Sequence, residues 1–367
     1  MALTIFNCGT AYHRNSPDVI AHLNKVTTSP HHINDGVGSG NMVPFSTGVG
    51  KSNPGGARTL GGMIFGSGIE ANVAAGIEAI TSHIKAETEA ARGRKPLPPI
   101  VNMAGWSRGA VTCFKIANIM SQDAQLKSIP VNIFAIDPVP GSSGVGNSEM
   151  WKHIELTGNV KNCCVIIAWH DSRRAFAPII VPKNMVPAGC NYYTYLMPGN
   201  HSSIVEEKAG ITEAARLVKH MAMRFLIQYG TRFSDRYRLL DGQVIEYYSS
   251  IAENWNNYQK LAGKYFTSRI VVTQNEEGNT IDSMKITPER KEPFFINEHH
   301  KEVYLSEYPK LYHELTLPAA RAFGKDRYKD GWGKELRKMR ILKYHASADA
   351  VFQYAHSIGK NCAPPHR

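Results

Sequence analysis

The sequence predicts an α/β fold, with a mostly parallel sheet that carries helices on both faces. Short apolar segments of strand length recur through the first 200 residues, and amphipathic helical segments lie between them. The content of 43% hydrophobic and 20% charged residues is that of a globular protein. Strands that alternate with helices form parallel sheets through right-handed crossovers, so helices are expected on both sides of one sheet.

Five segments have the length and composition of buried strands. Several are rich in Val and Ile, as expected where a strand is covered on both faces. The segments are Leu3–Asn7, Ile100–Ala104, Val131–Asp137, Cys163–Trp169 and Tyr192–Met197. We expect these five segments to form the parallel sheet.

Three helices are predicted between or after these strands. Residues Ile69–Lys85 carry isoleucine and valine at three- and four-residue steps, which is the pattern of an amphipathic helix. Ala110–Met120 repeats that pattern after the second strand, and Thr212–Gln228 has apolar residues four positions apart. Each of these helices is expected to pack one face on the sheet.

The remaining segments are interpreted from their composition. Residues 31–62 are rich in Gly, Asn, Ser and Pro without periodicity, which predicts a long loop, and Arg92–Pro99 predicts a stiff connector. After about residue 230 the pattern becomes polar and tyrosine-rich, without further strand–helix units. We therefore expect a core over residues 1–230 and a mixed or helical C-terminal cap or appended region over residues 231–367.

The six cysteines are scattered, and no C-x-x-C pair is present. This spacing argues against a structural zinc site and against a dense disulfide framework, so reduced thiols are expected. Cys163 and Cys164 are adjacent within a predicted strand, where neighbouring side chains point to opposite faces.

The chain has more basic than acidic residues. The net charge is +11, and nine Lys and Arg lie between Arg321 and Lys343. Such a cluster favours anionic surfaces, so peripheral contact with an anionic membrane is one expectation, and nucleic acid is the less favoured partner. The plain alternative is a solvated helix face, because runs of charge are usually of that kind.

The sequence also bears on location. No segment approaches about 18 unbroken apolar residues, so no transmembrane helix is predicted. The N-terminal residues lack a positively charged start followed by a long apolar run, so no Sec signal peptide is predicted. A cytoplasmic location is expected, and secretion by a system that needs no cleaved signal stays open.

The strongest local signal is G-x-S-x-G at Gly105–Gly109, between an apolar strand and a helix. The glycines allow a sharp turn that exposes the Ser107 hydroxyl above the helix N-terminus. The backbone N–H of Arg108 then points to where a tetrahedral oxyanion would form. We therefore predict that Ser107 is a nucleophile and that Arg108 contributes to the oxyanion site.

A nucleophilic serine needs a base, and the base needs an acid that holds its tautomer. His170 and His201 both follow predicted core strands downstream of Ser107, and His201 lies in the glycine-bearing loop expected for the base. The expected acid is Asp137, which ends one strand, and Asp171 is the alternative. The plain interpretation of Asp171 is a salt bridge to a neighbouring arginine.

Several motifs together resemble a bacterial family of α/β-hydrolases that includes the first class of type VI secretion lipase effectors. The resemblance covers about residues 3–210. It rests on Cys8-Gly9-Thr10, the Gly-rich segment at 60–70, Gly105-Trp-Ser-Arg-Gly-Ala110, Asp137-Pro-Val, His170-Asp-Ser-Arg-Arg-Ala-Phe176 and Pro198-Gly-Asn-His201. The family implies an α/β-hydrolase fold, with Ser107 as nucleophile, His201 as base, Asp137 as acid, and Gly9 and Thr10 beside the oxyanion site.

The expected function is therefore that of a serine esterase or lipase. Relatives in the family include phospholipases, which implies membrane lipids as substrates and an effector role. A triad of this kind requires no metal and no organic cofactor. Two alternatives remain: an esterase or deacylase that acts on another acyl group, and a non-catalytic scaffold that binds anionic membranes through Arg321–Lys343.

Overall fold

The computed structural model describes residues 2–39, 69–92, 98–141, 155–173, 176–181, 183–208, 211–234, 247–248, 250–251, 254–261, 269–274 and 280–286. The basic segment Arg321–Lys343 lies outside these residues, as do most of the predicted loop at 31–62 and Cys362. Their predicted roles stay predictions.

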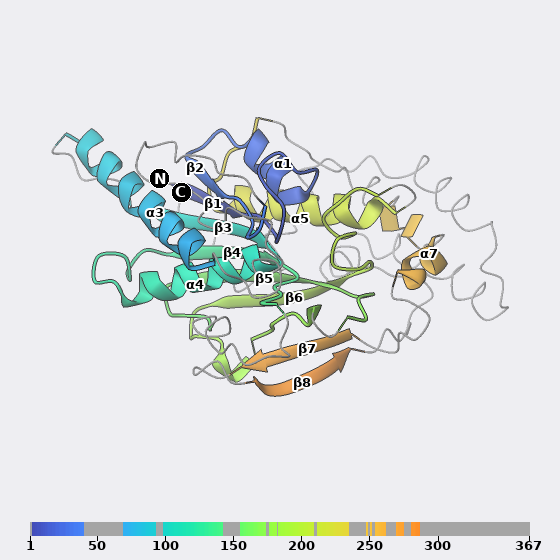
Figure 1. The fold of residues 1–367 in the computed structure, drawn as a ribbon. Helices are drawn as coiled ribbons and strands as arrows, with labels where there is room; N and C mark the ends of the chain where they lie inside the picture. Colours follow the sequence, from blue (N-terminus) through green and yellow to red (C-terminus); the bar gives the residue numbers. More distant parts are fainter. Residues whose placement is uncertain are drawn as a thin grey trace, which may run out of the picture.

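A six-stranded, all-parallel sheet forms the centre of the fold, in the order β2-β1-β3-β4-β5-β6 (Figure 1). The predicted α/β class is confirmed, and the architecture is consistent with that of α/β-hydrolases. The strands are β1 (Ala2–Asn7), β2 (His31–Asn34), β3 (Ile100–Trp106), β4 (Val131–Ile136), β5 (Val160–Ala168) and β6 (Asn191–Met197).

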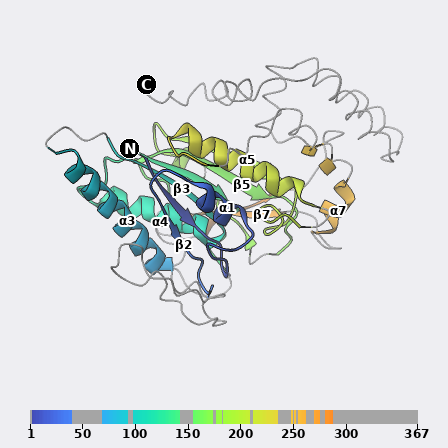
Figure 2. The same cartoon turned by 90° about the horizontal axis from the view of Figure 1, so that it is seen from above.

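Helices cover both faces of the sheet, as Figures 1 and 2 show. Helices α1 (Val19–Val26) and α5 (Glu213–Gln228) pack over one core, and α3 (Ile69–Ala90) and α4 (Arg108–Gln122) over the other. Alternate strand residues divide between the two cores: Cys164 enters the first and Cys163 the second. The adjacent cysteines therefore point apart, as predicted, and both are free thiols.

The prediction of a loop from residue 31 is wrong at its start, because His31–Asn34 form strand β2. The segment has a mostly polar composition, but its Ile33 pairs with Phe6 of β1 and is buried. The strand lies at the edge of the sheet and has four residues, so it needs little apolar content of its own. Helix α1 was not predicted either; Asp18 caps it by accepting the N–H groups of Ile20 and Ala21.

A row of asparagines crosses the sheet at one level. The strand register places Asn102, Asn132, Asn162 and Asn191 side by side on β3 to β6. Each side-chain amide after the first donates to the previous amide oxygen, at 2.7 to 2.9 Å. At the end of the row on β3, the side-chain amide of Asn102 donates to the carbonyl oxygen of Tyr229 and to the hydroxyl of Thr231, which both follow α5. This row fixes the register of four strands and attaches α5 to the sheet.

The strand order places a topological switch between β1 and β3. From β1 the chain moves outward to β2, returns past β1 to β3, and then continues in the opposite direction to β4. The crossover helices α1 and α3 therefore lie on opposite faces. In open parallel sheets, ligand sites form outside the carboxyl ends of the strands at such a switch. This is where the predicted site residues after β1 and β3 lie.

The chain beyond residue 230 contributes to the core as well. Tyr248, Ile251 and Tyr258 are fully buried in the cluster that includes α5. Tyr258 belongs to the six-residue helix α7 (Trp255–Lys260), and further along lies an antiparallel pair, β7 (Arg269–Gln274) with β8 (Thr280–Ile286). The division into a core over 1–230 and an appended region over 231–367 stays a proposal.

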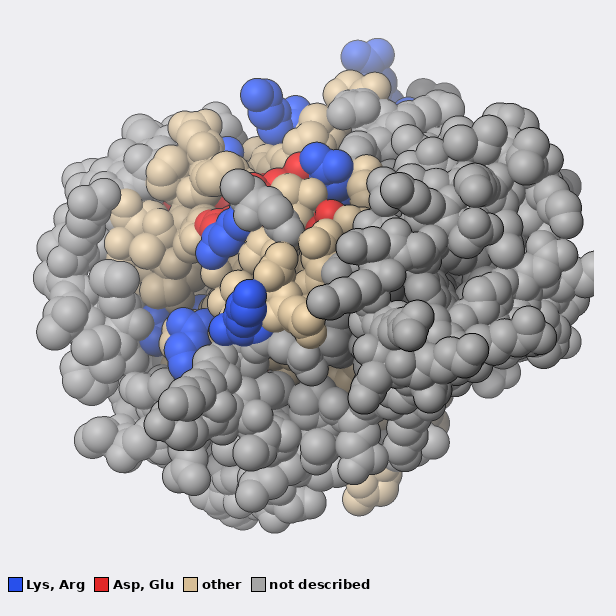
Figure 3. Space-filling model, turned by 90° about the vertical axis from the view of Figure 1, so that its right-hand side faces the viewer, with Lys and Arg blue, Asp and Glu red and all other residues tan. Residues whose placement is uncertain are grey.

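Surface charge and helix length add two observations. On the face seen in Figure 3, a few acidic side chains of the described residues lie between Lys and Arg side chains above and below them. Among the described helices, none combines the length and the apolar character needed to span a membrane.

Candidate active site

Ser107 lies in a strained turn between β3 and α4. Its φ of 58° and ψ of −127° belong to a region that residues with a side chain rarely adopt. Its N–H still donates to the carbonyl oxygen of Ile136, which continues the pairing of β3 with β4, and its carbonyl oxygen accepts the first helical bonds of α4. The turn therefore presents Ser107 at the carboxyl edge of the sheet and at the N-terminus of α4.

The two glycines of the motif allow this turn because no Cβ would fit at either position. A Cβ on Gly105 would lie 2.4 Å from the carbonyl oxygen of Gly109, across the turn. A Cβ on Gly109 would lie 2.1 Å from the carbonyl oxygen of Asn7, at the end of β1. Helix α4 thus starts in direct contact with the backbone of β1 and β3, which brings the loop after β1 close to Ser107.

That loop holds Gly9 and Thr10, and Arg108 ties it to the far side of the site. The Arg108 guanidinium donates to Thr10 Oγ1 at 3.1 Å and to the carbonyl oxygen of Pro140 at 3.3 Å. Burial lowers the pKa of Arg108 to about 10, so the side chain stays charged at neutral pH. Within the described residues, the N–H groups of Gly9 and Thr10 make no hydrogen bond, while that of Ala11 donates to Val37.

Asp137 follows β4 directly and is fully buried. Its N–H donates to the carbonyl oxygen of Ile166 at 2.7 Å, and its Oδ1 accepts the N–H of Ala168 at 3.0 Å. Both contacts attach it to β5, so its position is fixed from the backbone. It is a second residue in the region of positive φ, at 41°, which turns the carboxyl group over the edge of the sheet.

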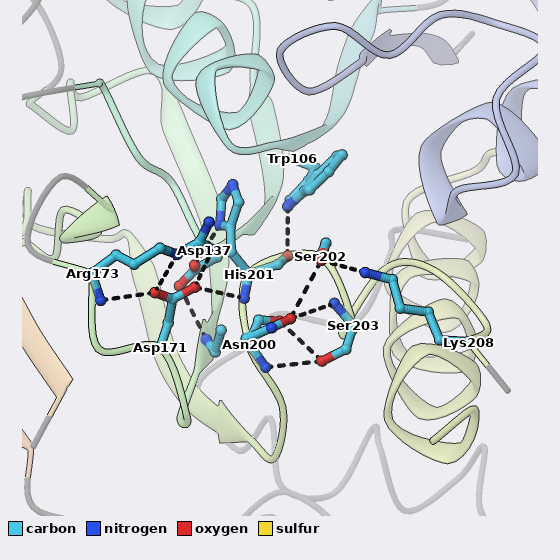
Figure 4. A network of polar contacts seen from close by, with 10 residues as sticks. Trp106, Asp137, Asp171, Arg173, Asn200, His201, Ser202, Ser203 and Lys208 are labelled. Carbon is cyan, nitrogen blue, oxygen red and sulfur yellow. Dashed lines mark hydrogen bonds and ion pairs between the residues drawn. The ribbon is translucent and has the colours of Figure 1, made fainter. Parts of the chain in front are cut away.

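His201 reaches this carboxyl group from the loop after β6. Its Nδ1 lies 2.7 Å from Oδ2 of Asp137, and both side chains are almost completely buried (Figure 4). An ionised carboxylate only accepts hydrogen bonds, so Nδ1 carries the proton and Nε2 is left as a proton acceptor. This is the tautomer that a general base needs.

Aromatic side chains hold the His201 ring next to the serine turn. Trp106, which directly precedes Ser107, packs its ring 5.1 Å from the imidazole and donates from Nε1 to the carbonyl oxygen of His201. Phe176 approaches from another side, with ring centroids 4.9 Å apart and planes at 70°. Tyr12 packs edge-on against Trp106. The base is therefore fixed relative to the strand end that carries Ser107.

The alternative acid Asp171 contacts the backbone of His201 and not its ring. Asp171 Oδ2 accepts the His201 N–H at 3.0 Å, and both oxygens accept hydrogen bonds from Arg173. The other histidine, His170, is buried and accepts the N–H of Gly199 through Nδ1. Burial lowers its pKa to about 4. Both residues hold the loop that carries His201.

Some of these contacts were not predicted from the sequence. Trp106 lies inside the motif and Phe176 inside the predicted His170–Phe176 element, yet neither was assigned to the base. An aromatic residue next to the nucleophile is the signal that could have identified Trp106. Nothing in the local sequence indicates that Asp171 takes the N–H of a residue 30 positions later.

Comparison with protein-family models gives no match, and comparison with curated proteins gives none either. Among solved structures, the chain is similar to an uncharacterised protein from Pseudomonas aeruginosa, with 13% identity and a TM-score of 0.40 over 98% of this chain and 62% of that one. It is also similar to the Tle1 effector bound to the VgrG spike from the Type 6 secretion system, with 16% identity and a TM-score of 0.35.

The second likeness covers 56% of this chain and 50% of the effector, so this chain spans between half and two thirds of the length of either structure. Likenesses at this level carry no argument about activity. The chemical interpretation therefore rests on the geometry of Ser107, His201 and Asp137.

Proposed function

We propose that this chain is a serine hydrolase that cleaves carboxylic esters, with Ser107 as nucleophile, His201 as general base and Asp137 as the acid. The observation that carries the proposal is the 2.7 Å contact between His201 Nδ1 and Asp137 Oδ2, beside the strained turn of Ser107. It supports a base whose proton-accepting nitrogen is Nε2.

The reaction follows from these roles. His201 Nε2 takes the hydroxyl proton while Ser107 Oγ attacks the ester carbonyl, and Asp137 stabilises the imidazolium that forms. The N–H of Arg108, together with that of Gly9 or Thr10, stabilises the oxyanion. The imidazolium then protonates the leaving alcohol, and water releases the acid from Ser107 by the same steps in reverse.

Lipid esters are the proposed substrate class, because the motifs of residues 3–210 resemble those of lipase effectors. A comparison of ester hydrolysis across acyl lengths, with phospholipid vesicles as a second substrate, tests this. Long-chain esters and vesicles should be the better substrates, and Ser107→Ala should remove turnover from both. Preference for acyl groups of two to four carbons would point to the alternative, an esterase on non-lipid acyl substrates.

Retained turnover in a folded Ser107→Ala variant would reject the nucleophile. If the native chain has no hydrolytic activity but binds anionic vesicles, the scaffold alternative with Arg321–Lys343 is favoured. Repeating the binding with neutral vesicles and at two salt concentrations separates specific contact from general electrostatic attraction.

A further inference from the structure

We propose that Asp171 and Arg173 are positioning residues that hold His201 by its backbone and by its ring at once, and that their opposite charges balance beside it. The inference rests on the proposed function in taking His201 as the base. It concerns two residues that the triad itself does not require.

The contact to the backbone runs through Asp171, which is almost fully buried directly after β5. Its Oδ2 accepts the His201 N–H at 3.0 Å. Arg173 fixes the carboxylate with three donors: its N–H and Nε donate to Oδ1 at 3.1 and 3.0 Å, and Nη2 donates to Oδ2. With this support, the carboxylate has a single orientation toward the backbone of His201 (Figure 4).

The contact to the ring runs through Phe176. The guanidinium carbon of Arg173 lies 3.6 Å from the centroid of the Phe176 ring. The same ring meets the imidazole of His201 edge-on, with 4.9 Å between centroids. Arg173 therefore supports both contacts, and the segment after β5 holds His201 through side chains other than Asp137.

The pair also places two opposite charges near the imidazole. A negative charge on Asp171 favours a positive charge on the imidazole, and the positive charge of Arg173 disfavours it. The hydrogen bond to Asp171 raises the pKa of Arg173, and the charge of Asp137 adds to this, so Arg173 stays protonated. A substitution that removes one member leaves the charge of the other.

Other charged or ionisable side chains also lie on the elements packed around His201. Glu206 and Lys208 in its own loop pair with each other at 3.4 Å, and Glu206 also accepts the hydroxyl of Tyr12 after β1. Arg108 at the start of α4 points to Thr10 and Pro140. His170 is neutral at neutral pH, because burial lowers its pKa. None of these is changed by a substitution at Asp171 or Arg173.

The test is a pH titration of the His201 imidazole by NMR, in the full chain labelled with ¹⁵N-histidine. His201→Gln identifies the signal by its absence. Asp171→Asn keeps an acceptor for the His201 N–H but leaves the charge of Arg173, so the titration midpoint should fall by about half a pH unit. Arg173→Met leaves the charge of Asp171, so the midpoint should rise by a similar amount. Arg173→Lys keeps the charge and should restore the midpoint.

The matched control is Arg216→Met, which removes another partly exposed arginine that pairs with a carboxylate, Glu207, and lies over a ring, Tyr247. It should leave the midpoint unchanged. In the ester assay, Asp171→Asn and Arg173→Met should lower kcat by about 3- to 30-fold with little change in KM, and the acid limb of the pH profile should move with the NMR midpoint.

Midpoints that stay fixed in both variants, or that move in the same direction, would overturn the proposal. Because Arg173 is half exposed, its variants keep the test valid even where Asp171→Asn does not fold. The NMR signal does not depend on turnover. If the proposed hydrolase function is wrong, the native chain will have no ester hydrolysis, or a folded Ser107→Ala variant will retain it. If the positioning role is wrong, the titration midpoints will show it.

Discussion

Ser107 has a backbone conformation that its own side chain disfavours. A non-glycine residue at a φ of 58° and a ψ of −127° costs on the order of 1 to 3 kcal/mol. Stability alone would select glycine at such a position, so the serine side chain is retained at a cost to folding. The strain of the turn therefore lies at the proposed nucleophile itself.

Ser107→Gly should therefore raise the free energy of unfolding by about 1 kcal/mol, since relief of strain exceeds the added entropy of the unfolded chain. Urea unfolding measures this. Ser107→Ala is the matched control, because it removes the hydroxyl and keeps the strain. A glycine variant no more stable than the alanine variant would contradict the interpretation.

Asp137 and Asp171 both approach His201: Asp137 is hydrogen-bonded to its ring and Asp171 to its backbone N–H. In Asp137→Asn, the amide oxygen can keep the bond from Ala168, which turns the NH₂ group toward His201 Nδ1. The proton is then held on Nε2, and His201 is no longer a base. We expect kcat for ester hydrolysis to fall by about 10³- to 10⁴-fold, as with a wrong tautomer in other triads.

Asparagine tolerates the positive φ at position 137, so the variant is expected to fold. Circular dichroism and thermal unfolding serve as the control for folding. A loss for Asp171→Asn as large as that for Asp137→Asn would contradict the assignment of the acid.

Among the elements, the asparagine row is a polar structure inside an apolar sheet. Asn132 lies within it, donating to Asn102 and accepting from Asn162. Asn132→Ala removes both bonds and leaves a buried acceptor and a buried donor with fewer partners, so unfolding should become easier by about 2 to 4 kcal/mol. The exposed Asn257→Ala in α7 is the control, with a change within about 0.5 kcal/mol. Chemical unfolding distinguishes the two, and equal effects would contradict a structural role for the row.

The strands were predictable where burial makes the sequence apolar. The five predicted strands agree with β1, β3, β4, β5 and β6, although β5 starts three residues earlier, at Val160. The edge strand β2 and the eight-residue helix α1 were not predicted, because short elements need few apolar residues. For α1 a signal exists: Asp18 precedes its first residue as a capping side chain.

The site was predictable in part for a similar reason. The serine turn is a local motif, whose glycines and strand–helix context lie within a few residues. The choice between Asp137 and Asp171 depends on how the loop after β6 folds back over β5, which brings the His201 ring to one carboxylate and its N–H to the other. No spacing in the sequence encodes that path.

At the scale of the whole molecule, stability should depend on pH through Asp18. Burial raises its pKa to about 7, although two backbone N–H groups oppose this shift. The folded state therefore binds this proton more tightly than the unfolded chain. Its contribution to stability is present below about pH 4 and is lost as the pH rises through 7.

Asp18→Asn keeps the N-cap of α1 but does not ionise. The free energy of unfolding of the variant minus that of the native chain should therefore be larger at pH 8 than at pH 4.5, by about 1 to 3 kcal/mol. Urea unfolding at both values measures the difference. The low pKa of His170 has the opposite effect, with stability lost as the pH falls from 6.5 to about 4, but it affects both proteins alike. An equal difference at both pH values would contradict the role of Asp18.

Covalent labelling with a fluorophosphonate, followed by mass spectrometry of the peptides, tests whether His201 activates Ser107 and needs no knowledge of the substrate. We expect one adduct, on Ser107, that disappears in Ser107→Ala and forms far more slowly in His201→Gln and Asp137→Asn. A folded chain that takes no label, or that labels equally fast without the imidazole, would contradict it.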